Sequence, residues 1–206
     1  MTDPIAPLRE FVAAMTALVG RTQDEHHLLA EGRAGLTHLL ARDDWLPGAF
    51  ATPRVDRYAQ YLLHADPLER FSVVSFVWGP GQRTPVHDHT VWGLVGVLRG
   101  AEACEEYALE QGVPVPTGRR HVMQRGDIDA VSPTVGDWHR VSHAGGAHAT
   151  VSIHVYGANI GAVARHRQAD TGALLDFVSG YDNVVVPNLW DRSAAVRAAA
   201  AAAARC

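Results

Sequence analysis

Cysteine is scarce in this 206-residue chain, and neither a long apolar run nor a block of Lys and Arg occurs anywhere in it. The two cysteines, Cys104 and Cys206, and the lack of a charged-then-apolar leader favour free thiols in a cytoplasmic protein. No apolar run reaches the roughly 18 residues of a membrane span. The net charge of -4 also argues against nucleic acid or an anionic membrane as a partner. We therefore expect a small-molecule partner.

What the chain does contain is enough apolar sequence for one domain, at 47% hydrophobic residues. We assign 1–206 to a single domain, with a helical part at 1–55, a barrel at 56–168 and an extension at 169–206. Apolar residues recur at helical spacing from Pro7 to Val19 and again after Asp24, a candidate helix cap. Residues 45–53 are expected to form a loop. The Ala-rich tail at 191–205 predicts a further helix.

The middle of the chain changes to short runs rich in Val, Phe and Trp, separated by Gly and Pro. Many short strands at close spacing predict an antiparallel sandwich or barrel, and no repeat of fixed period is visible. The predicted strands are Phe71–Trp78, Val91–Leu98, Glu102–Tyr107, Asp129–Ser132 and Ala149–Tyr156.

Histidine is unusually frequent, with 12 residues, and two of them form a His-x-His pair at His87 and His89. Alternation along an extended segment sends both imidazoles to the same side. The spacing from Gly81 through this pair to Gly93 and Gly100 resembles the first sequence motif of the cupins. The stretch from Gly126 to His139 resembles the second motif, with one extra residue on each side of Pro133. This resemblance implies a mainly β cupin fold, a small antiparallel barrel or jelly roll, with His139 as third ligand.

Three imidazoles without a carboxylate would leave coordination positions open on a divalent metal. Imidazole accepts iron, zinc, copper and nickel, so the ligand type does not select the ion. Three histidines with an open position also suit catalytic zinc. Asp88, between the two histidines, is expected to point away from them and to have a structural role rather than bind metal.

A second polar group lies in the strand predicted at 149–156, where Ser152, His154 and Tyr156 alternate with apolar residues. All three therefore share one strand face, where hydroxyl, imidazole and phenol can form a hydrogen-bonded relay. A polar strand face open to water is the alternative. The neighbouring histidine motifs favour the relay, because a barrel interior can bring such a face to a metal.

Three segments together resemble the cysteine dioxygenase family of thiol dioxygenases: Pro85–His89, Trp138–Val141 and the Ser-x-His-x-Tyr pattern at 152–156. The resemblance extends from about Arg57 to about Arg167, roughly half of the chain. It implies a cupin barrel, ferrous iron and a sulfinic acid product. It also assigns the iron ligands to His87, His89 and His139, and the relay to Ser152, His154 and Tyr156.

The chain departs from the animal enzymes of that family in two places. Their crosslinked cysteine, shortly after His-x-His, has no counterpart in the segment 91–94, so Tyr156 should stay unmodified. Cys104 is interpreted as an ordinary strand residue. The second departure is Gln60, which resembles the carboxylate anchor of a bacterial subgroup that includes the 3-mercaptopropionate dioxygenases. Arg165 adds a positive charge near the pocket or, alternatively, on the surface.

We therefore expect an Fe(II)-dependent dioxygenase that converts a small carboxylated thiol, 3-mercaptopropionate above others, to its sulfinic acid with O2. Dioxygenation of L-cysteine or mercaptosuccinate is an alternative within the class. A zinc or manganese isomerase or hydrolase, and a cupin that binds metal or ligand without turnover, are alternatives outside it. The sequence leaves the oligomeric state open.

Overall fold

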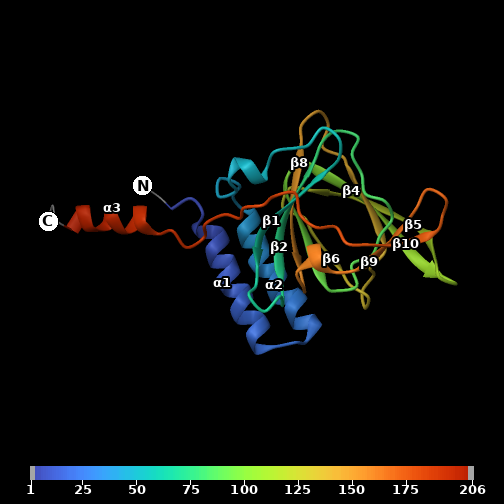
Figure 1. The fold of residues 1–206 in the computed structure, drawn as a ribbon, viewed down its shortest axis with the longest axis horizontal. Helices are drawn as coiled ribbons and strands as arrows, with labels where there is room; N and C mark the ends of the chain where they lie inside the picture. Colours follow the sequence, from blue (N-terminus) through green and yellow to red (C-terminus); the bar gives the residue numbers. More distant parts are fainter. Residues whose placement is uncertain (1–2, 204–206) are drawn as a thin grey trace.

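A computed structural model describes residues 3–203 and begins with two helices, α1 (Ala6–Arg21) and α2 (Glu25–Leu40). Short 3-10 turns occur at Gly48–Phe50 and Ile160–Ala162, and α3 (Ser193–Ala203) ends the described chain, standing away from the body in Figure 1. The strands are β1 (Ala59–Ala65), β2 (Ser72–Trp78), β3 (Gly93–Arg99), β4 (Ala101–Glu110), β5 (Val113–Gln124), β6 (Ile128–Val131), β7 (His139–His143), β8 (Thr150–Tyr156), β9 (Arg165–Gln168) and β10 (Leu174–Phe177).

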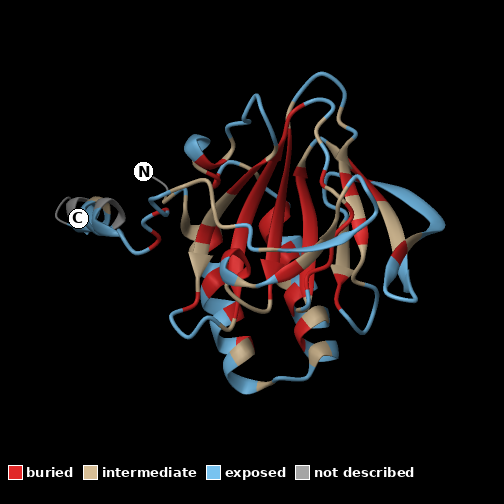
Figure 2. Ribbon diagram, turned by 45° about the vertical axis from the view of Figure 1, so that its right-hand side comes forward, coloured by how far each residue is buried: buried red, intermediate tan, exposed pale blue. Residues whose placement is uncertain are grey.

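The strands form two principal antiparallel sheets (Figure 1). One has the order β1-β2-β8-β3-β6, the other has the order β5-β4-β7, and β9 and β10 form a separate hairpin. The larger sheet pairs strands that are far apart in sequence, such as β2 with β8, so the barrel depends on long-range pairing. Buried residues concentrate along the central strands of the larger sheet, as Figure 2 shows.

Helices α1 and α2 cover the outer face of the five-stranded sheet. Asp24 caps α2 by accepting a hydrogen bond from the His27 backbone N–H at 3.0 Å, as the sequence predicts. The helix lies so close to β3 that a Cβ on Gly96 would come within 2.5 Å of the Leu40 side chain. Glycine at this position therefore lets the second helix lie against the sheet.

Strand β8 is buried on both faces, and the alternation of its side chains separates two environments. Val151, Ile153 and Val155 belong to the apolar core beneath the helices. Ser152, His154 and Tyr156 point the other way, into the barrel. One strand thus supplies both the helix-packed core and a row of buried polar groups.

The predicted architecture is confirmed as a mainly β cupin fold with N-terminal helices and a C-terminal helix. All five predicted strands are present, and no end is shifted by more than three residues. The expected loop at 45–53 contains a 3-10 turn and buries Trp45, whose indole N–H donates to the Leu39 carbonyl at 3.0 Å. Within residues 3–203, no helix is long and apolar enough to cross a membrane.

Candidate metal centre

His87, His89 and His139 come together as the sequence predicts, with one nitrogen of each ring within 4.8 Å of the others. The ring centroids are 4.8 to 4.9 Å apart and all three side chains are buried. His87 and His89 lie in the extended segment before β3, whereas His139 opens β7. The two segments are joined by reciprocal backbone hydrogen bonds between His87 and His139, at 3.0 and 3.1 Å.

Nδ1 of each of the three imidazoles contacts another group of the protein. Asp137 lies 2.9 Å from Nδ1 of His89, the Pro85 carbonyl lies 3.1 Å from that of His87, and Cys104 Sγ lies 3.6 Å from that of His139. Such contacts orient metal-binding imidazoles. Nε2 of His89 is buried and has no hydrogen-bond partner among the described residues. A bound ion would satisfy this nitrogen, so the donor set fits a divalent metal.

Burial is the largest cause that holds the pKa of both His87 and His139 well below the usual histidine value, and the neighbouring imidazoles lower it further. The two rings are therefore neutral near pH 7, the form in which imidazole binds a metal. Burial alone would raise the pKa of Asp137, but the hydrogen bonds that its carboxylate accepts from His89 and Thr90 lower it overall. Asp137 thus accepts as a carboxylate.

The relay predicted on β8 is also assembled. Ser152 Oγ lies 2.8 Å from His154 Nε2, and His154 Nδ1 lies 2.7 Å from the Tyr156 hydroxyl. Burial lowers the pKa of His154 strongly and raises that of Tyr156, so both groups are neutral near pH 7. A Cβ on Gly93 would come within 2.7 Å of the Tyr156 ring. Glycine at this position thus lets Tyr156 pack against β3.

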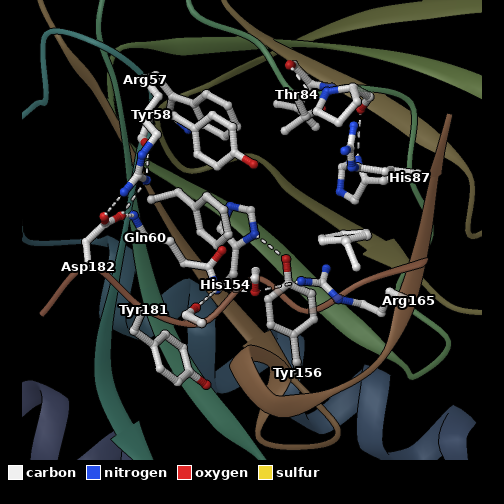
Figure 3. A pocket seen from close by; sticks show the side chains of 18 of the residues that line it. Arg57, Tyr58, Gln60, Thr84, His87, His154, Tyr156, Arg165, Tyr181 and Asp182 are labelled. Carbon is white, nitrogen blue, oxygen red and sulfur yellow. Dashed lines mark hydrogen bonds and ion pairs between the residues drawn. The ribbon is translucent and has the colours of Figure 1, made fainter. Parts of the chain in front are cut away.

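A cavity of about 350 Å³ opens beside these groups, lined by His87, His139, His154 and Tyr156 (Figure 3). Arg165 also faces it and is only 4% exposed. Its Nη2 donates to Ser179 at 2.9 Å and its guanidinium carbon lies 4.6 Å from the Phe177 ring centroid. The surface alternative considered for Arg165 therefore does not apply.

Gln60 lines the same cavity but uses its amide nitrogen within the protein. Its Nε2 donates to the Ser179 hydroxyl and to the Gly180 carbonyl, both at 3.1 Å. Its backbone N–H donates to Asp182, which also forms an ion pair with Arg57. Gln60 thus holds the segment 177–183, which we call the C-terminal strap, across one side of the cavity (Figure 3).

Two residues near the centre, Asp88 and Cys104, have contacts that the sequence partly predicts. Asp88 points away from the ligand rings and accepts from the backbone N–H of His166 at 2.7 Å, the expected structural role. Cys104 lies on β4 and is free, but it contacts a ligand histidine; Cys206 lies outside the described residues.

Cys104, His121 and Asp129 form a second group of donors within 4.8 Å of one another. His121 and Asp129 already pair at 2.6 Å and Cys104 already contacts His139, so these groups have partners without an ion.

Asp137 was missed because its only sequence feature is its place two residues before His139. Its contact with His89 crosses 48 residues and no spacing rule reports it.

No protein-family model matches the chain. Among solved structures, the chain is similar to a double-stranded β-helix protein from Klebsiella pneumoniae, with TM-score 0.44 and 15% identity over 63% of this chain and 91% of that one. A cupin superfamily protein from Desulfitobacterium hafniense has a TM-score of 0.42 and 12% identity, over 55% of this chain and 90% of that one. An oxalate oxidase in complex with glycolate has a TM-score of 0.43 and 16% identity, over 52% of this chain and 55% of that one. Similarity at this level assigns no activity.

Proposed function

We propose that this protein is an iron-dependent thiol dioxygenase that oxidises a small carboxylated thiol to its sulfinic acid. One observation carries the proposal: a single cavity is lined by two members of the buried three-histidine cluster, by two members of the relay and by a buried arginine, namely His87, His139, His154, Tyr156 and Arg165. The resemblance of the sequence segments at 85–89, 138–141 and 152–156 to the cysteine dioxygenase family supports the same reaction.

His87, His89 and His139 would hold the metal through Nε2. When bound there, ferrous iron supplies sites for a thiolate and O2 and couples oxidation of the sulfur to reduction of O2. Both oxygen atoms end on the sulfur, so no outside reductant is needed to reach the sulfinic acid. His87 and His139 are neutral donors that add no negative charge, so a bound metal would favour the anionic thiolate over the thiol.

Arg165 is the residue we propose to bind the substrate carboxylate. Among the described residues it makes no ion pair, and its Nε is buried without a hydrogen-bond partner. A buried cation without a counter-ion is costly, and a ligand carboxylate would remove that cost with a charge-assisted hydrogen bond. Gln60 would assist indirectly, because it holds Ser179, which also accepts from Arg165.

Tyr156 is the residue we propose to handle protons. Its hydroxyl faces the cavity and contacts His154, and its ring stacks on the ring of His89 with centroids 5.5 Å apart. This places the hydroxyl beside the proposed metal site. It can donate a hydrogen bond to substrate or oxygen atoms there while remaining a neutral phenol.

The charges in the cavity favour a substrate without an amine. Asp182 is the only acidic residue that lines it within residues 3–203, and Arg57 already pairs with that carboxylate. The ammonium group of L-cysteine would therefore find no free carboxylate. We propose 3-mercaptopropionate as the preferred substrate, with L-cysteine and mercaptosuccinate as the alternatives.

Oxygen uptake tests the proposed activity. Full-length protein loaded with Fe(II) without air should consume O2 when 3-mercaptopropionate is added, and mass spectrometry should detect the sulfinic acid. The zinc-loaded protein and the iron-treated His89→Ala variant serve as controls and should consume none above background. A zinc or manganese isomerase or hydrolase, or a binding module without turnover, predicts no uptake from any thiol in the panel.

A further inference from the structure

Three arginines line a second polar hollow, next to the cavity that holds the relay. Arg83, Arg140 and Arg167 border this hollow of about 480 Å³, which we call the arginine recess. The recess shares Thr84, Pro85 and Arg167 with the catalytic cavity. Within residues 3–203, its lining includes none of the ligand histidines and none of the relay residues. It is therefore a neighbouring hollow with its own chemistry.

Backbone hydrogen bonds bring the three arginines together from distant parts of the chain. The extended segment 83–87 lies between β7 and β9. On one side the Thr84 N–H donates to the Val141 carbonyl at 2.9 Å, and on the other the Gln168 N–H donates to the Val86 carbonyl at 2.8 Å. Each of the three paired segments contributes one arginine. The positive charges are thus fixed by paired backbone.

Contacts within the described chain leave most of this positive charge unbalanced. Within residues 3–203, Arg83 and Arg167 form no ion pair, and Arg140 approaches Glu105 only to 3.8 Å, too far for a hydrogen bond. Glu105 also lies 3.7 Å from another arginine. Asp170 lines the recess but forms no ion pair within the same range. Guanidinium groups gathered in this way repel one another, and a bound anion would relieve the repulsion.

Arg140 also has a donor without a partner. Its Nε is buried and has no hydrogen-bond partner among the described residues. Its guanidinium carbon lies 5.8 Å from the Tyr107 ring centroid, so the aromatic ring supports the group without accepting from Nε. A buried N–H donor that lacks an acceptor is costly. An oxyanion bound to this guanidinium group would supply the acceptor.

The lining of the recess indicates which anion fits. The catalytic cavity has aromatic side chains such as Tyr58, Phe76 and Trp78, whereas the described lining of the recess has none. A compact polar ion is therefore favoured over an apolar one. Three arginines less one aspartate leave an excess of about two positive charges, which matches a doubly charged ion. Guanidinium groups bind phosphate oxygens in pairs.

We propose that Arg83, Arg140 and Arg167 form a binding site for a doubly charged phosphate group beside the catalytic cavity. Inorganic phosphate and a compact phosphate monoester present the same oxygens to the guanidinium groups. The site lies outside the proposed thiol oxidation and does not depend on it. Binding can therefore be measured without turnover.

Calorimetry on the full-length, zinc-loaded protein tests the site. At pH 8 and constant ionic strength, inorganic phosphate and glycerol 3-phosphate should each bind with one ion per chain, and sodium chloride should give no saturable heat. The tighter of the two phosphates identifies the source of the group, and either order supports the site. Absence of saturable binding by both overturns the proposal.

Arg83→Gln removes one charge of the recess with little risk to the fold, because Arg83 is exposed. It should raise the Kd for phosphate about tenfold or more, the loss expected for one hydrogen bond to a charged group. Arg83→Lys, which keeps the charge, should recover part of the affinity. The matched control is Arg125→Gln in the exposed turn between β5 and β6, which should leave the Kd unchanged. Equal Kd values for Arg83→Gln and Arg125→Gln overturn the site.

Phosphate bound in the catalytic cavity, on the metal or on Arg165, is the alternative. His89→Ala weakens the metal site and Arg165→Met removes the cation of that cavity, but neither residue lines the recess. Both variants should therefore retain the phosphate affinity of the unmodified protein. Affinity lost in these two variants and retained in Arg83→Gln overturns the proposal.

The iron-loaded enzyme gives a second readout, which rests on the proposed function. Saturating phosphate should raise KM for 3-mercaptopropionate about twofold or more and leave kcat unchanged, because it places negative charge beside the cavity that receives an anionic substrate. Arg83→Gln should remove most of this inhibition. An enzyme inactive on every thiol refutes the proposed function and leaves the calorimetric result standing. Inhibition of equal strength in Arg83→Gln overturns the site.

Discussion

The two faces of the five-stranded sheet differ in what their side chains leave unsatisfied. On the outer face, β8 presents Val151, Ile153 and Val155 to the helices, and apolar contact completes the packing. The inner face lines the barrel interior, where buried polar atoms of His89, Glu102 and Arg165, which come from outside this sheet, lack partners within the described residues. We therefore propose that the barrel interior, unlike the helix-packed face, receives a metal and an anion from outside the chain.

Substitution of the proposed metal ligands should cause the largest loss of bound metal and of activity. Replacing His87, His89 or His139 by Ala removes one of three donors, so each variant should lose most bound iron and nearly all activity. Elemental analysis and circular dichroism would check this, with the fold retained because the helix-packed core is untouched. Full iron occupancy in all three variants would mean that the ligands are others.

The matched change on the outer face is Ile153→Ala, one residue from the relay but on the helix side of β8. Truncating a buried Ile should lower the free energy of unfolding by about 2 to 5 kcal/mol because it leaves a cavity. Metal content per folded protein should stay at the level of the unmodified chain. Loss of iron without loss of stability would contradict the division between the faces.

The barrel interior should also contain a charge that destabilises the protein at high pH, on Glu102 of β4. Folding raises the pKa of Glu102 from 4.5 to about 7, so its contribution to stability is fully present below pH 4.5 and is lost as the pH rises through 7. Glu102→Gln should therefore gain stability relative to the unmodified protein above pH 7, by roughly 3 kcal/mol. Urea denaturation at pH 5 and pH 8 measures this, with Glu110→Gln as the control.

A smaller effect should distinguish substrates within the cavity. We expect kcat/KM to be higher for 3-mercaptopropionate than for L-cysteine by about 1 kcal/mol of transition-state stabilisation or more, because no carboxylate is free for the amine. Arg165→Met should reduce kcat/KM for 3-mercaptopropionate at least tenfold and so narrow the difference in kcat/KM between the two thiols. The kcat/KM for a thiol without a carboxylate, such as 2-mercaptoethanol, should change little in this variant. Equal efficiency with L-cysteine would refute the substrate preference.

Sequence predicted the parts of the site that depend on local patterns. The His-x-His spacing and the alternation on β8 placed five polar side chains inside the barrel without any knowledge of pairing partners. What it missed depends on contacts across the fold. Asp137 reaches His89 across 48 residues, and the amide of Gln60 reaches the strap across 119.

The burial of Glu102 also could not be predicted from the sequence. In sequence it is one of three glutamates close together in a strand, with nothing to mark it from Glu105 and Glu106. Those two side chains pair with arginines on neighbouring strands. Only the pairing of β4 with β5 and β7 in the opposite sheet leaves Glu102 buried, so its difference from its neighbours arises from tertiary structure.

If the groups that line the cavity catalyse thiol dioxygenation, both atoms of O2 are added to the sulfur of the thiol. The most direct measurement is turnover of 3-mercaptopropionate by the iron-loaded protein under ¹⁸O2 in unlabelled water, followed by mass spectrometry of the product. The account predicts a sulfinic acid that carries two ¹⁸O atoms on sulfur. A disulfide as the only product, a single ¹⁸O atom, or no consumption of O2 would contradict it.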